Sequence, residues 1–138
     1  MAVEPFTPLP ARLYAEGVAC VTLAIRRDNP HAKDTRFIAT AQQAYARLPE
    51  GIEERVLAGV TRSLVLEVAE RLLPVRRTAV LEGELSLVDE AFITSVSREV
   101  LPVVRVDGRA LGDGRVGPKT RAILDAFAAL VERERERL

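Results

Sequence analysis

Apolar and polar residues follow one another along the chain in patterns typical of both strands and helices. Residues 17–26 are rich in valine, leucine and isoleucine, which predicts a buried strand. Apolar positions three or four residues apart predict helices over residues 34–48 and 61–73. The apolar stripe of the second helix consists of Leu64, Val65, Val68, Leu72 and Leu73. Thr61 is its candidate capping residue, because a threonine hydroxyl can accept a hydrogen bond from a free first-turn amide.

The second half of the chain alternates short apolar runs with turn signals. Residues 75–81, 91–94 and 100–106 are predicted to be extended, and 84–88 a short helical turn. Asp107-Gly108 and Gly112-Asp113-Gly114 predict tight turns. Pro118 suits the first position of a last helix. That helix has the apolar stripe Ile123, Leu124, Phe127, Leu130 and Val131. The order of strands and helices predicts a mixed α/β fold.

The bulk composition is typical of one soluble domain. The chain has 138 residues, of which 48% are hydrophobic and 29% charged. We therefore predict a single domain over residues 1–138. Residues 1–12 contain three prolines and should form an irregular lead-in. Residues 132–138 alternate in charge and should form a charged, solvated helix tail.

Charge and cysteine usage narrow the range of partners. Twenty basic and 20 acidic residues balance, which argues against a nucleic-acid partner. No apolar stretch reaches membrane-spanning length and the amino end does not resemble a signal peptide, so we expect a cytoplasmic protein without a membrane partner. The one cysteine, Cys20, cannot form an internal disulfide and is expected in the core. We expect no metal site.

Two turns and one lysine are candidates for chemistry. Lys33 follows the first predicted strand and its loop, where an amine can face a cleft, although a lone loop lysine is usually on the surface. Gly59-Val60-Thr61 lies at a helix start, where a glycine and free amides suit a phosphate. An ordinary helix cap is the alternative there. Ser95-Val96-Ser97 follows a predicted strand, and a simple polar turn is the alternative interpretation.

Three stretches resemble the class IV aminotransferases, the family of branched-chain aminotransferases, D-amino acid aminotransferases and aminodeoxychorismate lyases. Residues 29–37 (NPHAKDTRF) are similar to the segment around the family's Schiff-base lysine. Residues 56–62 (VLAGVTR) resemble its Leu-x-Gly-Ile/Val-Thr-Arg motif. Residues 87–100 (LVDEAFITSVSREV), together with 114–120 (GRVGPKT), are similar to the strand, turn and helix start that follow. The resemblance covers about residues 10–131.

This resemblance implies the large domain of a fold type IV enzyme that binds pyridoxal phosphate. Lys33 matches the cofactor-binding lysine, and burial beside a cofactor would make its amine lose a proton readily. The cofactor phosphate would be held by Gly59, by the amides of Val60 and Thr61, and by the Thr61 hydroxyl. Leu57 matches the side chain that packs on the cofactor ring; otherwise it is a core residue.

The serine-rich turn has a role in the same comparison. In the family it offers amides and hydroxyls to the phosphate and to the substrate carboxylate. Val96 stands where the family usually has a hydroxyl, so its contact would come from the backbone, while Ser95 or Ser97 supplies a hydroxyl. The substrate implied is an amino acid or an amino-chorismate.

Two pieces of the family pattern have no match in the sequence. One is the smaller amino-terminal domain. The other is the segment whose glutamate pairs with the pyridine nitrogen, because Glu54 runs almost directly into the motif at 56–62. Without this carboxylate the ring is a weaker electron sink, so we expect slow turnover or none. Strands left unpaired by this internal deletion favour either self-association or a rebuilt core, and of the two we expect a homo-oligomer.

Two other hypotheses stay open at this point. One is a non-catalytic truncated remnant that serves as an association module. The other is an unrelated small α/β binding domain that carries the glycine-threonine and strand-serine motifs by chance. The second would gain support if Lys33, Thr61 and Ser97 lay on different faces.

Overall fold

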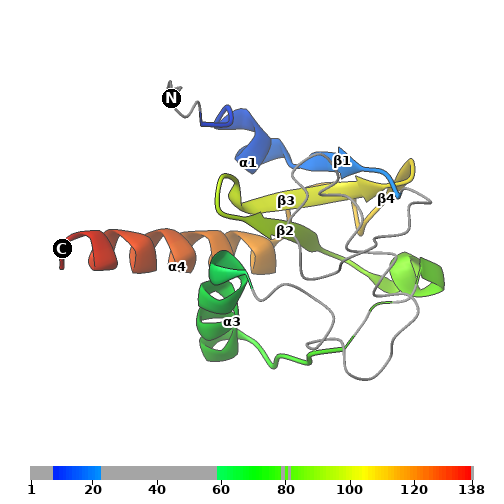
Figure 1. Ribbon diagram of the computed structural model, residues 1–138. Coiled ribbons are helices and arrows are strands. Elements are labelled where there is room, and N and C mark those ends of the chain that lie inside the picture. The colour runs from blue at the N-terminus through cyan, green and yellow to red at the C-terminus, as the bar shows by residue number, and fades with distance from the viewer. Residues whose placement is uncertain (1–7, 23–58, 79, 81, 138) are drawn as a thin grey trace, which may run out of the picture.

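A computed structural model describes residues 8–22, 59–78, 80 and 82–137 of the chain (Figure 1). Helices and a sheet alternate along it, which confirms the predicted mixed α/β class. The elements are α1 (Arg12–Glu16), β1 (Val18–Cys20), α3 (Val60–Leu72), the 3-10 helix η3 (Glu82–Leu87), β2 (Ala91–Ser95), β3 (Glu99–Val106), β4 (Arg109–Ala110) and α4 (Pro118–Arg135). The helix predicted over 34–48 lies outside the described residues, and so does the end of the strand predicted over 17–26.

The sheet is built around β3. β1 pairs with it in parallel, with Val18 opposite Val103, and β2 pairs with it antiparallel, with Ala91 opposite Val103. The short strand β4 folds back on β3 through the turn at Asp107-Gly108. Both turn residues have positive φ, 49° and 79°, as the favoured two-residue hairpin requires.

One apolar cluster joins the helices to the start of β3. It contains Val65 and Ala69 from α3, Val100 from β3, and Ile123 and Phe127 from α4. Figure 1 shows α4 running beneath the sheet, with α3 in front of it. The stripes predicted for the two helices therefore meet in one core, because residues three and four apart share a helix face.

A second cluster lies around the other half of β3. Val103, Val106 and Leu111 are buried there, against partly buried residues of β1, β2 and η3. Cys20 is one of these partly buried residues, so it lies against the core and not inside it as expected. Burial raises the pKa of its thiol, and the nearby Asp107 carboxylate adds to this, so the thiol is a weaker nucleophile than usual.

One helix was missed and four sequence predictions need correction. Of the buried strand predicted over 17–26, the described residues form a strand only at Val18–Cys20, and none of these three residues is buried. The helix α1 was not predicted, because five residues carry too little periodicity to be seen. Residues 75–78 and 80 contain no strand. Leu72 is 46% exposed, so it does not belong to the buried stripe, although its neighbours Ala69 and Leu73 contact the core. Thr61 is not the cap of α3; it lies inside the first turn, and Gly59 is the capping residue.

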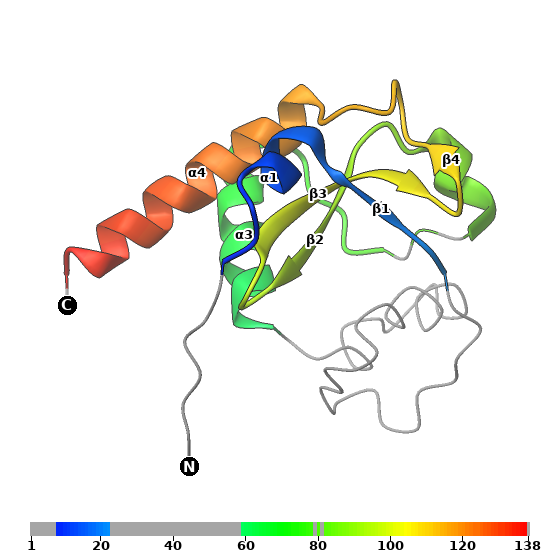
Figure 2. The same cartoon turned by 90° about the horizontal axis from the view of Figure 1, so that it is seen from above.

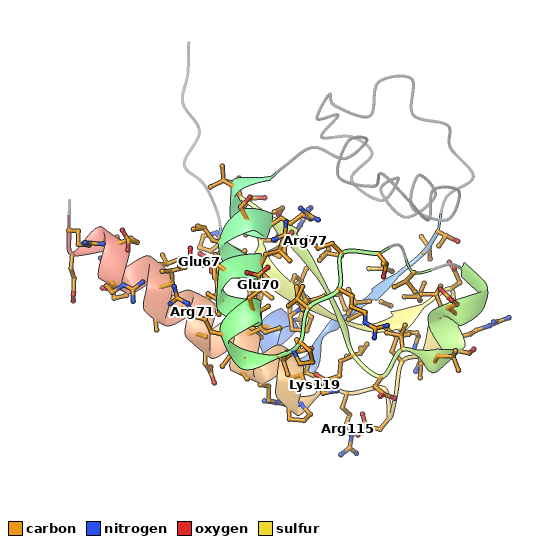
Figure 3. The ribbon with its side chains drawn as sticks, turned by 90° about the horizontal axis from the view of Figure 1, so that it is seen from below. Glu67, Glu70, Arg71, Arg77, Arg115 and Lys119 are labelled. Atoms are coloured by element: carbon orange, nitrogen blue, oxygen red, sulfur yellow. The ribbon has the colours of Figure 1, made fainter. Side chains whose placement is uncertain are left out.

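Ion pairs cover the solvent side of α3. Figure 3 shows Arg71 beside Glu67 and Arg77 beside Glu70, and the paired atoms are 2.5 and 2.9 Å apart. All four side chains are about half exposed or more, and exposed pairs contribute little stability. The predicted charged tail is helical to Arg135 and carries similar surface pairs.

Candidate functional site

The first turn of α3 begins without a side-chain cap. Gly59 is the capping residue, with extended φ and ψ of −69° and 136°, and it has no side chain to offer. The first helical hydrogen bond runs from the Ser63 amide to the Gly59 carbonyl, 3.0 Å. The amides of Val60 and Thr61 therefore lack intrahelical acceptors, as they do in any first turn. The Thr61 side chain is buried, 7% exposed, while Val60 is 69% exposed.

The turn between β2 and β3 is the second part of the site. β2 ends at Ser95, which lies opposite Glu99 at the start of β3. Within the turn the Arg98 amide donates to the Ser95 hydroxyl, 3.1 Å. Val96 is 70% exposed. In the described part of the chain, no acceptor takes a hydrogen bond from the amides of Val96 or Ser97.

These two sets of amides belong to neighbouring parts of the fold. Figures 1 and 2 both show the start of α3 next to the turn that joins β2 to β3. The helix α3 packs on both strands, in a cluster that joins its Val65 to Val100 of β3 and Phe92 of β2. Positions 59–61 and 95–97 are thus brought together from segments 34 residues apart. A phosphate at this place would meet the positive end of a helix and a second group of free amides.

Two predicted site residues lie outside the described residues. They are Lys33 and Leu57, so their roles stay predictions. The described residues bring together Gly59, Val60 and Thr61 with Ser95, Val96 and Ser97, and the turn at 95–97 keeps Ser95 for an internal hydrogen bond.

The first turn of α4 is occupied in a way that local sequence does not reveal. The Lys119 amide donates to Glu90 Oε1, 3.3 Å, and the Thr120 amide to Glu90 Oε2, 2.7 Å. Burial acts to raise the pKa of Glu90, but these amides, the Thr120 hydroxyl and the Lys119 charge outweigh it and lower the pKa. Since Pro118 has no amide hydrogen, Glu90 satisfies the first turn of α4.

A second carboxylate holds the far end of the sheet. Asp107 accepts from the Thr22 amide, 2.6 Å, and from the Thr22 hydroxyl, 2.7 Å. Its own amide donates to the Cys20 carbonyl, 2.9 Å. The Thr22 hydrogen bonds lower the pKa of Asp107, and the Arg109 charge adds to this. The sequence showed Asp107 only as a turn residue; its clamp on β1 depends on tertiary structure.

Comparison with known proteins settles the family. The model of the family "Amino-transferase class IV" matches residues 37–106, half of the chain. The chain belongs to the class IV aminotransferase family. The hypothesis of an unrelated α/β binding domain is therefore wrong. Both candidate turns, 59–61 and 95–97, lie within the matched region.

Individual relatives agree with this assignment. A D-alanine aminotransferase of Staphylococcus aureus (strain N315) is 31% identical over 109 residues, which cover 74% of this chain and 38% of the relative. A branched-chain-amino-acid aminotransferase of Salmonella typhimurium is 38% identical over 81 residues, 58% of this chain and 26% of the relative. The chain thus spans well under half of the length of these curated relatives.

Solved structures show the same fold. A crystal structure of the Escherichia coli branched-chain amino acid aminotransferase superposes with a TM-score of 0.68 at 22% identity, over 88% of this chain and 53% of that one. The branched-chain aminotransferase of Thermoproteus uzoniensis gives 0.68 at 24% identity, over 94% and 55%. These matches support the fold type IV assignment.

The described residues contain neither a membrane-spanning helix nor a metal-binding cluster. None of the described helices is long and apolar enough to cross a membrane. No group of three or more histidine, cysteine or acidic residues in the described ranges could hold a metal ion.

Proposed function

We propose that this chain binds pyridoxal phosphate through its phosphate group, at the start of α3 and the turn between β2 and β3. The observation that carries the proposal is the neighbouring position of free amides at Val60 and Thr61 and at Val96 and Ser97. Both groups lie in the family motifs that hold this phosphate. Helix N-termini and free amides suit a dianion, so the residues present fit the phosphate end of the cofactor.

The side chains around these amides have separate parts in the proposal. Gly59 lets a phosphate approach, since among the described residues a β-carbon there would meet only the Arg62 side chain, at 3.9 Å. Thr61 adds its hydroxyl, and Ser97 adds another from the turn. Val96 contributes only its backbone amide, and Leu57 packs on the ring.

Lys33 is the proposed cofactor-binding lysine and the proposed base. Its amine would take and return the proton that moves on the substrate. The bound cofactor supplies an electron sink for amino-group transfer, or for lyase chemistry of the aminodeoxychorismate type. The sequence has no match for the glutamate that keeps the ring nitrogen protonated. We therefore propose that the chain alone turns over its amino acid or amino-chorismate substrates slowly or not at all.

A titration with two forms of the vitamin tests the proposal. Pyridoxal phosphate should bind at least about tenfold more tightly than pyridoxal, because charge-assisted hydrogen bonds each contribute about 1.5–3 kcal/mol. The visible absorbance band of the bound cofactor should disappear in Lys33→Ala and persist in Lys119→Ala, which removes an exposed lysine at the start of α4. Equal affinity for the two forms would contradict the phosphate site.

Turnover separates this proposal from its alternative. The alternative is a non-catalytic remnant that acts as a homo-oligomeric association module, since β2 has no second strand partner among the described elements. Rapid transamination that Lys33→Ala abolishes would refute slow turnover. A chain that binds neither form of the vitamin but sediments as a dimer or larger would favour the module.

A further inference from the structure

The peptide groups of Arg98 are held on both sides by side chains. Its amide donates to the Ser95 hydroxyl within the turn, 3.1 Å. Its carbonyl accepts from the Tyr14 hydroxyl, 3.2 Å, across 84 residues of sequence. The first bond is internal to the turn, so Tyr14 provides the connection to another part of the fold.

The turn between β2 and β3 is strained and makes few packing contacts, so a hydrogen bond from another element should restrict its conformation. Glu99 adopts a left-handed conformation with φ of 54°, which costs a non-glycine residue about 1 kcal/mol. The Val96 side chain is 70% exposed, so it contributes little packing. A turn with this strain and few contacts samples other conformations unless something fixes it.

The helix that carries Tyr14 is well placed to fix the turn. The α1 helix ends with a hydrogen bond from the Gly17 amide to the Leu13 carbonyl, 3.1 Å. Gly17 has φ of 78° and lies so close to Val104 of β3 that a β-carbon would be 2.5 Å from the valine side chain. β1 then pairs with β3 directly after Gly17. The helix that carries Tyr14 is thus anchored to β3, the strand that begins at Glu99 directly after the turn.

The hydroxyl of Tyr14 also stays a donor. Burial raises the pKa of Tyr14, and the nearby Glu99 charge adds to this, while Arg98 opposes it. The phenol is therefore protonated at all pH values where the protein would be assayed.

We propose that Tyr14 is a positioning residue for the phosphate end of the cofactor. By holding the Arg98 carbonyl it fixes the direction of the Val96 and Ser97 amides. This inference rests on the proposed function, since it needs those amides to bind the phosphate. Among the described residues, the Tyr14 hydroxyl donates its hydrogen bond to the turn, so we infer that it acts through the turn and not on the cofactor.

The test compares two variants that each lose one hydroxyl at opposite ends of β3. Tyr14→Phe removes the bond to Arg98, and Thr22→Val removes the bond to Asp107, 2.7 Å. The purified full chain is titrated with inorganic phosphate, pyridoxal phosphate and pyridoxal. Tyr14→Phe should weaken the first two by about five-fold, the value of one hydrogen bond, and leave pyridoxal unchanged. Thr22→Val should change none of the three.

Three other results would contradict the proposed function or the proposed role of Tyr14. Wild-type protein that binds neither phosphate nor pyridoxal phosphate refutes the proposed function, and the inference falls with it. Normal binding in the wild type with equal affinities in the two variants refutes the role of Tyr14 alone. An equal loss for pyridoxal phosphate and pyridoxal would mean general loosening, which also refutes it.

A stabilised background keeps the comparison valid if Tyr14→Phe unfolds. Glu99→Gly relieves the left-handed strain and should stabilise the hairpin, because glycine adopts positive φ freely. Within Glu99→Gly, Tyr14→Phe should still weaken phosphate and pyridoxal phosphate more than Thr22→Val does, but by less than five-fold, because part of the strain that Tyr14 opposes is gone. Equal affinities of the two variants in this background would refute the role of Tyr14.

Discussion

Two helices of this protein have the same kind of cap but differ in the partners of their first-turn amides. Both α3 and α4 have a glycine at the capping position and no hydrogen bond from a capping side chain. At α4 the carboxylate of Glu90 takes the amides of Lys119 and Thr120. At α3 the amides of Val60 and Thr61 have no such partner in the described chain.

The difference agrees with the proposed function, in which the start of α3, but not that of α4, binds the phosphate. A helix end buried or held by the fold needs its amides satisfied, and Glu90 does this for α4. The start of α3 is exposed at Val60, 69%, so water can satisfy its amide and the amide stays available to a ligand. Figure 2 shows the two helix starts apart from each other, with that of α3 at the β2–β3 turn. Figure 3 shows Arg115 and Lys119 at the start of α4, beyond the ion pairs of α3.

The largest expected effect comes from crowding the start of α4, where Glu90 binds the first-turn amides. A β-carbon at Gly117 would overlap the carboxyl group of Glu90, so Gly117→Ala should displace Glu90 and expose both amides. We expect a loss of about 2 kcal/mol in the free energy of unfolding, measured by urea denaturation, from the lost cap and the added crowding. Gly83→Ala is the matched control, since a β-carbon there meets nothing within 4 Å. Equal effects of the two substitutions would show that Glu90 moves aside without cost.

The next largest effect comes from adding a carboxylate at the start of α3, whose first-turn amides have no partner in the described chain. Gly59 has extended backbone angles that any residue can adopt, so Gly59→Asp should place a carboxylate over the free amides of α3. Stability should rise by a few tenths of a kcal/mol, while affinity for pyridoxal phosphate should fall by about tenfold or more, through competition and charge repulsion. Gly83→Asp adds the same charge elsewhere. Unchanged affinity in Gly59→Asp would place the phosphate away from α3.

The smallest effect is the pH dependence of the stability that Glu90 contributes at the start of α4. The folded-state pKa of Glu90 lies below its ordinary 4.5, so its contribution is present above that value and lost as the pH falls through the lowered pKa. Glu90→Gln should cost about 1 kcal/mol at neutral pH. The gap to wild type should close on acidification below about 4.5. Glu16→Gln, on an exposed residue, should show no such gap; a gap for Glu90→Gln that persists at acid pH would contradict the charged cap.

Sequence patterns predicted the long elements and missed what depends on tertiary contacts. The helices α3 and α4, the strands β2 and β3 and the turn at Asp107-Gly108 were all predicted, because each has its own periodicity or turn chemistry. The motif at Gly59 identified the helix start but assigned the cap to Thr61, since a hydroxyl normally outranks a glycine there. No local signal marks Glu90 or Tyr14, whose partners lie 29 to 84 residues away.

The pairing of β1 with β3 has a consequence for how such a chain tolerates changes in length. Thr22, two residues after the end of β1, meets Asp107 across 85 residues, so the sheet closes a very long loop. The entropy of closing a loop grows only with the logarithm of its length, by about 0.6 kcal/mol for each doubling. Relatives that carry extra strands in this interval would therefore close the same sheet at nearly the same cost. Long-range parallel pairing is slow to form, so we expect any difference in interval length to appear in the folding rate before it appears in stability.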